Sequence, residues 1–280
     1  MRPARALPHR SGFLTLGERT LIMGIVNVTP DSFSDGGVHF SAEDAGAGGL
    51  RMVSEGADIL DIGGESTRPG HVTITADEEW TRVAPVLEAF ARTQTPLPPI
   101  SIDTGKAEVA RRALQAGASI LNDIWGFQRD PALAGVAAET GAAAILMHNR
   151  ERIEAATDIV DDILRFLERS VVIATQAGVA QDRIVLDPGI GFGKTLEQNF
   201  QAIAALGRLR ALGFPVLLGA SRKSFIGRLF APQPPPPERV PGTIAANVFG
   251  ALAGADIVRV HDVAANVQAV RVLDAIRRAG

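Results

Sequence analysis

Polar side chains follow almost every short apolar run in this sequence, and they fall into two chemical groups. Asp103, Asn122 and Asp187 offer carboxylates and an amide, which suit the edge of a planar heterocycle that carries N–H donors. Lys223 could donate to a carbonyl oxygen on the same ring. The second group suits phosphate oxygens, and it consists of Ser66, Thr67, Arg68, Arg259 and His261.

Asn27 ends the first apolar run and offers a neutral oxygen ligand. Such a ligand fits a Mg²⁺ ion that is held mostly by substrate phosphates and water. A zinc site is not expected, because the chain has no cysteine and no pair of histidines at helical spacing. The stretch 189–195, GIGFGKT, also fails the P-loop pattern, because Pro188 stands where that pattern needs glycine.

The elements that must position these residues are eight apolar runs, each followed by a helical pattern. The runs are residues 21–27, 58–63, 99–103, 119–123, 142–148, 183–187, 215–220 and 256–261. They are almost continuously apolar, which is typical of parallel strands buried on both faces. Eight β-then-α units in 280 residues predict a single α/β domain, a (β/α)8 TIM barrel, spanning residues 1–280. A doubly wound sheet is the structural alternative.

A barrel would gather the strand ends at one face, where chemistry is expected. Asn27, Asp103, Asn122, Asp187 and His261 all stand at or just after a predicted strand end. His148 does so too, and its role stays open between a structural and a functional one. A single aspartate such as Asp103 or Asp262 could instead cap the helix that follows it. Eight polar strand ends on one face are harder to explain by capping alone, because buried polar groups are costly without partners.

Composition narrows the class of protein. Hydrophobic residues make up 46% of the chain, which allows a sizeable core. The net charge of −3 argues against a chain-wide nucleic-acid or membrane-binding field. No apolar run is long enough to span a bilayer and no secretory signal is seen, so a cytoplasmic location is expected. Residues 1–18 form an N-terminal extension, and the Pro-rich segment 231–242 is expected to be a surface loop.

The motifs GIVNVTPDSFSDGG, DIGGESTRPG, SIDT, LNDI, DPGIGFGK, GASRKSFIG and RVHDV occur in this order between residues 20 and 275. Together they closely resemble the dihydropteroate synthase family, whose members are pterin-binding barrel enzymes of folate biosynthesis. The resemblance implies a transferase that joins 4-aminobenzoate to 6-hydroxymethyl-7,8-dihydropterin diphosphate. The products would be 7,8-dihydropteroate and pyrophosphate, with Mg²⁺ as cofactor.

The resemblance also implies roles for particular residues. The pterin would be bound by Asp103, Asn122, Asp187 and Lys223, and the diphosphate by Asn27, Thr67, Arg68, Arg259 and His261, with Asn27 touching the metal. The aminobenzoate pocket, where sulfonamides compete, would be lined by Phe33, Thr67, Pro69, Phe192, Ser221 and Lys223. Catalysis would involve Asp31, Asp35, Lys223 and Arg259, with one of the two loop aspartates facing a developing pterin-methyl cation.

Two rival functions and one open question remain from the sequence. A methyltetrahydrofolate methyltransferase would share the barrel and the pterin pocket but would not need the SFSDGG and STRPG loops. A catalytically silent pterin-binding paralogue should have lost loop or anchor residues. A homodimer is implied by the resemblance, and the apolar positions Val263, Val267, Val270 and Leu273 belong either to its interface or to the inner face of the last barrel helix.

Overall fold

Eight parallel strands form a closed barrel. The computed structural model describes residues 4–28, 42–66 and 72–279. The barrel strands are β3 Leu21–Asn27, β4 Ile59–Gly63, β5 Ile100–Asp103, β6 Ile120–Asp123, β7 Ala143–Met147, β8 Ile184–Asp187, β9 Leu217–Leu218 and β10 Ile257–Val260. Their order is β8-β7-β6-β5-β4-β3-β10-β9, and a parallel bridge between Leu186 and Val216 joins the two ends of this order. The predicted (β/α)8 fold is confirmed.

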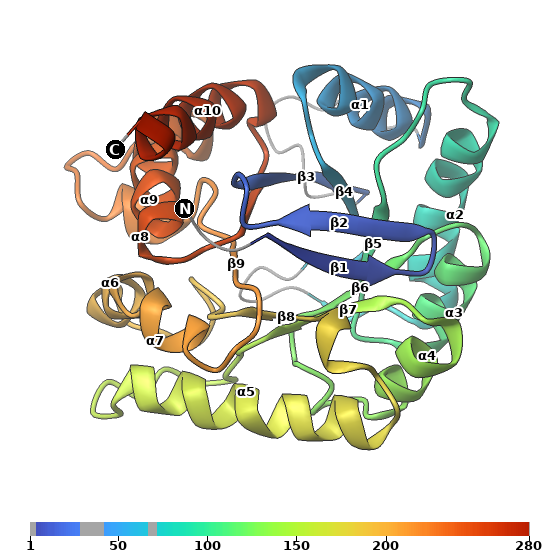
Figure 1. Cartoon of the computed structure of the whole chain (residues 1–280), viewed down its shortest axis with the longest axis horizontal. Coiled ribbons are helices and arrows are strands. Elements are labelled where there is room, and N and C mark those ends of the chain that lie inside the picture. Colours follow the sequence, from blue (N-terminus) through green and yellow to red (C-terminus); the bar gives the residue numbers. More distant parts are fainter. Residues whose placement is uncertain (1–3, 29–41, 67–71, 280) are drawn as a thin grey trace.

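Helices surround the barrel on its outer side (Figure 1). They are α1 Ala42–Glu55, α2 Ala76–Arg92, α3 Ala107–Gln115, α4 Ala132–Thr140, α5 Ile159–Gln176, α6 Leu196–Ala204, α7 Leu206–Arg210, α8 Ser224–Gly227, α9 Val240–Ala253 and α10 Val263–Ala279. Short 3₁₀ helices cover Gln181–Arg183 and Pro236–Arg239. Within the described ranges, no helix is long and apolar enough to cross a bilayer.

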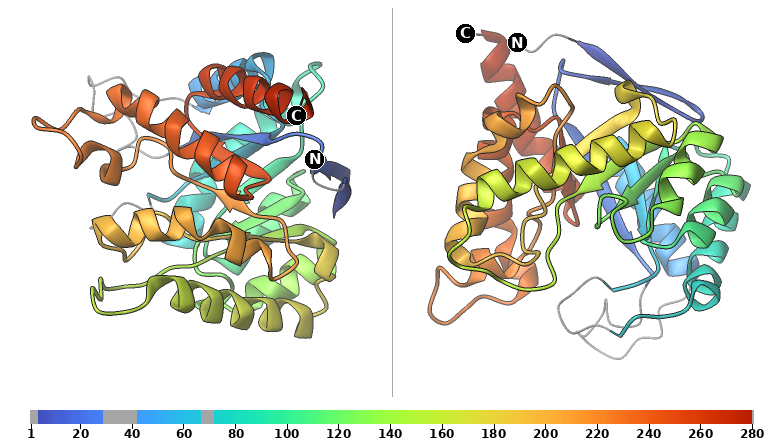
Figure 2. Two further views of the ribbon diagram at one scale, coloured as in Figure 1. Left: turned by 60° about the vertical axis from the view of Figure 1, so that its left-hand side comes forward. Right: turned by 90° about the horizontal axis from the view of Figure 1, so that it is seen from below.

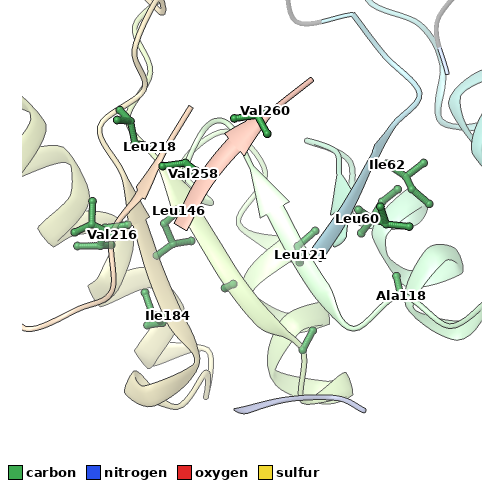
Figure 3. Close-up of a cluster of buried hydrophobic side chains, with 14 of the residues drawn as sticks. Leu60, Ile62, Ala118, Leu121, Leu146, Ile184, Val216, Leu218, Val258 and Val260 are labelled. Atoms are coloured by element: carbon green, nitrogen blue, oxygen red, sulfur yellow. The ribbon is translucent and has the colours of Figure 1, made fainter. Parts of the chain in front are cut away.

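Side chains alternate along each strand between the helices and the barrel interior. Leu60, Ile62, Leu121 and Val258 belong to the layer between strands and helices, part of which Figure 3 shows. The residues next to them in sequence point the other way. In β4, for example, Ile59 and Asp61 lie on the inner side. The barrel interior is therefore apolar at the start of the strands and polar at their carboxyl ends.

The N-terminal extension folds into an antiparallel hairpin of β1 Arg5–His9 and β2 Gly12–Leu16. It crosses one mouth of the barrel in Figure 1. Leu7 and Leu16 are fully buried against residues at the start of the barrel strands, including Leu21, Ile59 and Ile257. The hairpin thus closes the amino-terminal mouth of the barrel, a role that the sequence did not indicate.

Two other segments differ from their predicted bounds. Strand β9 covers only Leu217–Leu218 of the predicted run 215–220. Pro215 lies outside it and has no N–H to donate to a neighbouring strand. The Pro-rich segment is largely exposed, but it is not a loop throughout, because Pro236–Arg239 forms a 3₁₀ helix and α9 begins at Val240. In α10, the apolar positions Val263, Val267, Val270 and Leu273 are buried in the inner face of the helix.

The hairpin should contribute to stability without affecting chemistry at the opposite mouth. We expect Leu16→Ala to lower the free energy of unfolding by about 2–5 kcal/mol, because it leaves a cavity in a fully buried site. Phe13→Ala in the same strand is the matched control, since the Phe13 side chain is 67% exposed and should change stability by less than about 0.5 kcal/mol. Urea unfolding measures both. A loss of steady-state activity in folded Leu16→Ala would contradict this separation of roles.

Candidate active site

Five polar side chains from different strands meet inside the carboxyl end of the barrel. They are Asp61 of β4, Asp103 of β5, Asn122 of β6, Asp187 of β8 and Arg259 of β10. The parallel register places Asp103 beside Asn122, and Asp61 lies two residues before Gly63, the partner of Asp103 in β4. Since side chains alternate along a strand, Asp61 and Gly63 lie on the same face of the sheet.

The guanidinium of Arg259 is the centre of this cluster. Its Nε donates to Oδ2 of Asp61 at 2.6 Å, and its Nη2 donates to Oδ2 of Asp103 at 2.7 Å. The same oxygen of Asp61 accepts a hydrogen bond from Nδ2 of Asn122 at 3.1 Å. Arg259 therefore links three strands directly, and Asn122 joins a fourth strand through Asp61. Oδ1 of the buried Asp61 has no hydrogen-bond partner among the described residues, which leaves an acceptor for a bound molecule.

Burial changes how the carboxylates of this cluster titrate. It raises the pKa of Asp103 to about 7, although the Arg259 cation opposes this shift, and the neighbouring carboxylate of Asp61 adds to it. Burial also raises the pKa of Asp187, against the opposing charge of Lys223. N–H donors of a ligand, in place of the lost water, would favour the ionised form of both groups.

Lys223 and Phe192 lie together beside Asp187. The ammonium of Lys223 is 4.6 Å from the centre of the Phe192 ring and donates to the carbonyl oxygen of Ile190. Burial lowers the pKa of Lys223 to about 8, which the nearby Asp187 partly offsets. Asp187 itself accepts a hydrogen bond from the backbone N–H of Gly189 at 2.7 Å. The loop after β8 therefore connects the polar cluster to an aromatic wall.

Ser221 and His261 are in direct contact. Ser221 Oγ lies 2.9 Å from Nδ1 of His261 and accepts from the His261 backbone N–H at 3.1 Å. Between Ser221 and Lys223, Arg222 adopts a left-handed backbone conformation with φ of 56°. Its guanidinium makes a bidentate ion pair with Asp262, at 2.9 and 2.5 Å. This pair ties the loop after β9 to the end of β10.

The capping alternative for Asp103 is wrong, because the Asp103 side chain binds Arg259. Helix α3 has Lys106 at its N-cap position without a side-chain capping bond, and Asp130 accepts from the backbone N–H of Ala107 instead. Asp123, which follows Asn122, has a local structural role. Its two carboxylate oxygens accept from the backbone N–H groups of Trp125 and Phe127, which closes the turn after β6.

A cavity of about 600 Å³ opens beside the cluster. Asp103 and Phe192 line it, together with Trp125, Lys194 and Lys106. Lys106 Nζ donates to Glu65 at 2.5 Å and to the fully buried Glu79 at 2.6 Å. A cavity of this volume can hold a small-molecule substrate. Lys106, Glu65 and Glu79 form part of its wall.

Some sequence predictions lie outside the described residues, and some residues of the site were not predicted. Asp31, Phe33, Asp35, Thr67, Arg68 and Pro69 belong to the first group. Asp61, Lys106 and Lys194 belong to the second. Asp61 could have been found from strand alternation, since in DILDIG it stands two residues after the inward Ile59. Lys106 binds Glu65 and Glu79, and Lys194 contacts His148, all across distant segments of the chain, so no local pattern marks these contacts.

The donor set fits Mg²⁺ only in part. Asn27, half-buried at the end of β3, offers one neutral oxygen. Among the residues that the structure describes, no group of three histidine or acidic side chains could hold a metal ion. A magnesium ion here would therefore take most of its ligands from a phosphorylated substrate and water, as this cation commonly does.

The chain is similar to known proteins over most of its length. The family model described as pterin binding enzyme matches residues 23–261. The dihydropteroate synthase of Clostridium beijerinckii is 49% identical over 94% of this chain and 96% of its own length. The Bacillus subtilis dihydropteroate synthase is also 49% identical, over 95% and 92%.

Solved structures are similar over the same extent. A Xanthomonas albilineans dihydropteroate synthase with 4-aminobenzoic acid has a TM-score of 0.91 and 44% identity, covering 98% of this chain and 99% of that one. The enzyme from Clostridium difficile, solved in the presence of pteroic acid, has a TM-score of 0.88 and 48% identity, covering 94% and 98%. The barrel, its polar strand ends and these relatives lead to one conclusion: the chain belongs to the family of pterin-binding enzymes, among the dihydropteroate synthases.

Proposed function

We propose that the cluster around Arg259 binds the pterin of 6-hydroxymethyl-7,8-dihydropterin diphosphate, and that 4-aminobenzoate binds in the cavity beside it. The two substrates are joined to give 7,8-dihydropteroate, and pyrophosphate is released. The observation that carries this assignment is the group of Asp61, Asp103, Asn122 and Asp187, which gathers largely buried carboxylate and amide oxygens inside the carboxyl end of the barrel. A flat heterocycle with several N–H donors can satisfy these acceptors together.

Pterin recognition would use both acceptors and donors. Asp187 and the free oxygen of Asp61 accept from ring and amino N–H groups, while the amide of Asn122 can both donate and accept. Lys223 donates to the ring carbonyl, which requires its ammonium to leave the carbonyl of Ile190 or to share its donors. Because these groups are largely buried, a heterocycle that lacks one matching donor leaves a carboxylate unpaired and binds weakly.

The diphosphate would lie toward Asn27, Arg259 and His261, with Thr67 and Arg68 from the second loop also assigned to it. Arg259 and His261 stabilise negative charge as it develops on the departing pyrophosphate. A bound Mg²⁺, with Asn27 as its protein ligand, would neutralise part of the same charge. Asp61 and Asp103 hold the guanidinium of Arg259 in one orientation before substrate arrives, so little reorganisation is needed.

Bond formation requires no strong base. The aromatic amine of 4-aminobenzoate is neutral at pH 7 and carries a lone pair that attacks the pterin methylene. The methylene C–O bond breaks, its electron pair leaves with pyrophosphate, and the amine then gives up one proton. If C–O cleavage comes first, a pterin-methyl cation forms, and Asp31 or Asp35 is proposed to face it. Water must be excluded at this stage, because it would capture the cation.

The aminobenzoate pocket is assigned to Phe192, Ser221 and Lys223, together with Phe33, Thr67 and Pro69. The Phe192 ring supplies a flat apolar wall, and the Lys223 ammonium over that ring stands close to the position where the two substrates meet. A Yersinia pestis dihydropteroate synthase has been solved as a sulfonamide drug complex. We therefore expect sulfonamides to compete with 4-aminobenzoate in this pocket.

A homodimer is also proposed, through the outer face of α9 and α10. Phe249, Leu252, Val272 and Ile276 are each at least half exposed there, and Ile244, Val248 and Ala269 line a shallow apolar groove. Single exposed apolar residues are common on protein surfaces, whereas a contiguous apolar patch of this kind is typical of a protein–protein interface. Light scattering coupled to size-exclusion chromatography tests this directly, and Ile276→Glu should favour the monomer.

The reaction itself is tested by pyrophosphate release. We expect release that depends on the pterin diphosphate, on 4-aminobenzoate and on Mg²⁺ together, because the amine is the acceptor and the metal assists the leaving group. A silent pterin-binding paralogue would release no pyrophosphate under any condition. Release that is independent of 4-aminobenzoate would contradict the transfer step.

Pterin affinity should depend on pH through Asp103. With a pKa of about 7, Asp103 gains negative charge as the pH rises, and N–H donors bind the ionised form better. We expect the affinity for 6-hydroxymethylpterin, measured by calorimetry, to increase several-fold from about pH 6 to about pH 7.5. This window lies below the pKa of about 8 for Lys223, so loss of that donor does not mask the effect.

The variant Asp103→Asn should bind the pterin weakly and without this pH dependence. An Asn side chain keeps the size of Asp103 and can still accept from Arg259, so the fold should survive, which thermal unfolding checks. An unchanged affinity and an unchanged pH profile in Asp103→Asn would show that Asp103 only holds Arg259.

A further inference from the structure

Lys194 is a buried lysine whose ammonium is completely used in hydrogen bonds within the protein. Its Nζ donates to the carbonyl oxygens of Gly189 at 2.7 Å and Phe192 at 3.1 Å, and it lies 2.8 Å from Nδ1 of His148. An ammonium has three N–H groups, and these three acceptors satisfy all of them. Only 4% of the Lys194 surface is exposed. Burial lowers the pKa of Lys194 to about 7, which the nearby carboxylate of Asp187 partly offsets.

The loop that Lys194 holds has a backbone suited to this contact. Gly189, Gly191 and Gly193 all have positive φ, of 66°, 87° and 55°. A side chain at Gly189 would overlap the carbonyl oxygen of His148, and one at Gly193 would overlap Arg150. The loop therefore lies directly on the chain that follows β7. Its carbonyls at Gly189 and Phe192 point to Lys194, while that of Ile190 accepts from Lys223.

His148 fixes Lys194 from the opposite side. Its Nε2 is 2.9 Å from Asp162 of α5, and Arg150 Nε lies 3.0 Å from the same carboxylate. Because Nδ1 faces an ammonium, Nδ1 must be the acceptor and Nε2 must carry the proton. Burial and the Lys194 cation lower the pKa of His148 to about 3, which keeps the ring neutral. The edge of the Phe166 ring packs on it at 5.0 Å between centroids.

We propose that Lys194 and His148 are positioning residues that hold the loop 188–193 in the conformation that places Phe192 for 4-aminobenzoate. Lys194 binds the backbone carbonyl of Phe192, so it sets where the aromatic ring stands. His148 connects Lys194 to α5, because its Nδ1 contacts Lys194 and its Nε2 contacts Asp162 of that helix. This inference rests on the proposed function, since it takes Phe192 as a wall of the aminobenzoate pocket.

The histidine allows a matched pair of variants, because its two nitrogens contact different partners. In His148→Asn, the side-chain oxygen takes the place of Nδ1 and can still accept from Lys194, while the Asp162 contact is lost. In His148→Gln, the amide nitrogen takes the place of Nε2 and keeps the Asp162 contact, while the acceptor for Lys194 is lost. A merely structural histidine would not separate these two variants.

We expect His148→Gln and Lys194→Met to raise the KM for 4-aminobenzoate roughly tenfold, because small misplacements of a substrate wall are costly. The Kd for 6-hydroxymethylpterin should stay within about twofold, since the Asp61, Asp103 and Asn122 contacts are untouched. His148→Asn should keep a KM close to that of the unaltered protein. Hydrogen exchange should be faster at the amides of residues 190–194 in His148→Gln and Lys194→Met, and unchanged in His148→Asn.

Several outcomes would overturn this inference. Equal effects of His148→Asn and His148→Gln, or a parallel loss of affinity for both substrates, would show a general structural role. Phe192→Ala separates the inference from the proposed function on which it rests. A raised KM in Phe192→Ala with an unchanged KM in His148→Gln and Lys194→Met overturns the positioning role alone. An unchanged KM in Phe192→Ala contradicts the aminobenzoate assignment, and the positioning role fails with it.

Discussion

The ion pairs of Arg259 with Asp61 and Asp103 are the interaction on which the rest of the site depends. Three charged groups stand inside a barrel where isolated charges would be very costly. They are tolerated because each finds a partner from another strand, and Asn122 adds a hydrogen bond to Asp61. Removing the arginine would leave two buried carboxylates without a cation. The arrangement holds four strand ends in one geometry and leaves acceptors available to a ligand.

The loop after β8 connects the polar cluster around Arg259 to the cavity, because it follows Asp187 and carries Phe192. It begins after Asp187, whose carboxylate accepts a hydrogen bond from the backbone N–H of Gly189. Two lysines bind its backbone: Lys194 donates to the carbonyl oxygen of Gly189, and Lys223 donates to that of Ile190. Lys194 is buried and fully bonded, whereas Lys223 is bonded to one carbonyl and lies over the Phe192 ring. Two residues of the same type thus have different tasks, because one has all its donors occupied by protein and the other can turn to a substrate.

Stability and chemistry lie at opposite ends of the barrel. The β1–β2 hairpin lies at the amino-terminal mouth (Figure 2). Its Leu7 and Leu16 side chains are buried against apolar strand starts. At the carboxyl-terminal mouth, β3, β5, β6 and β8 end in polar residues. Strand alternation makes this division possible, because inward positions in one layer can be apolar and those in the next layer polar without a change in the outer face.

The sequence by itself determined the barrel class, the strand positions and most of the polar strand ends, because unbroken apolar runs and the residues after them are local features. It also predicted Asp103, Asn122, Asp187 and Lys223 as site residues, from their places at or after strand ends and from the motifs that contain them. Only the tertiary structure decided which of these side chains touch. The partners of Arg259 are as many as 198 residues away in the chain, and His148 meets Lys194 across 46 residues. Such contacts depend on strand register and loop conformation, and short sequence patterns contain neither.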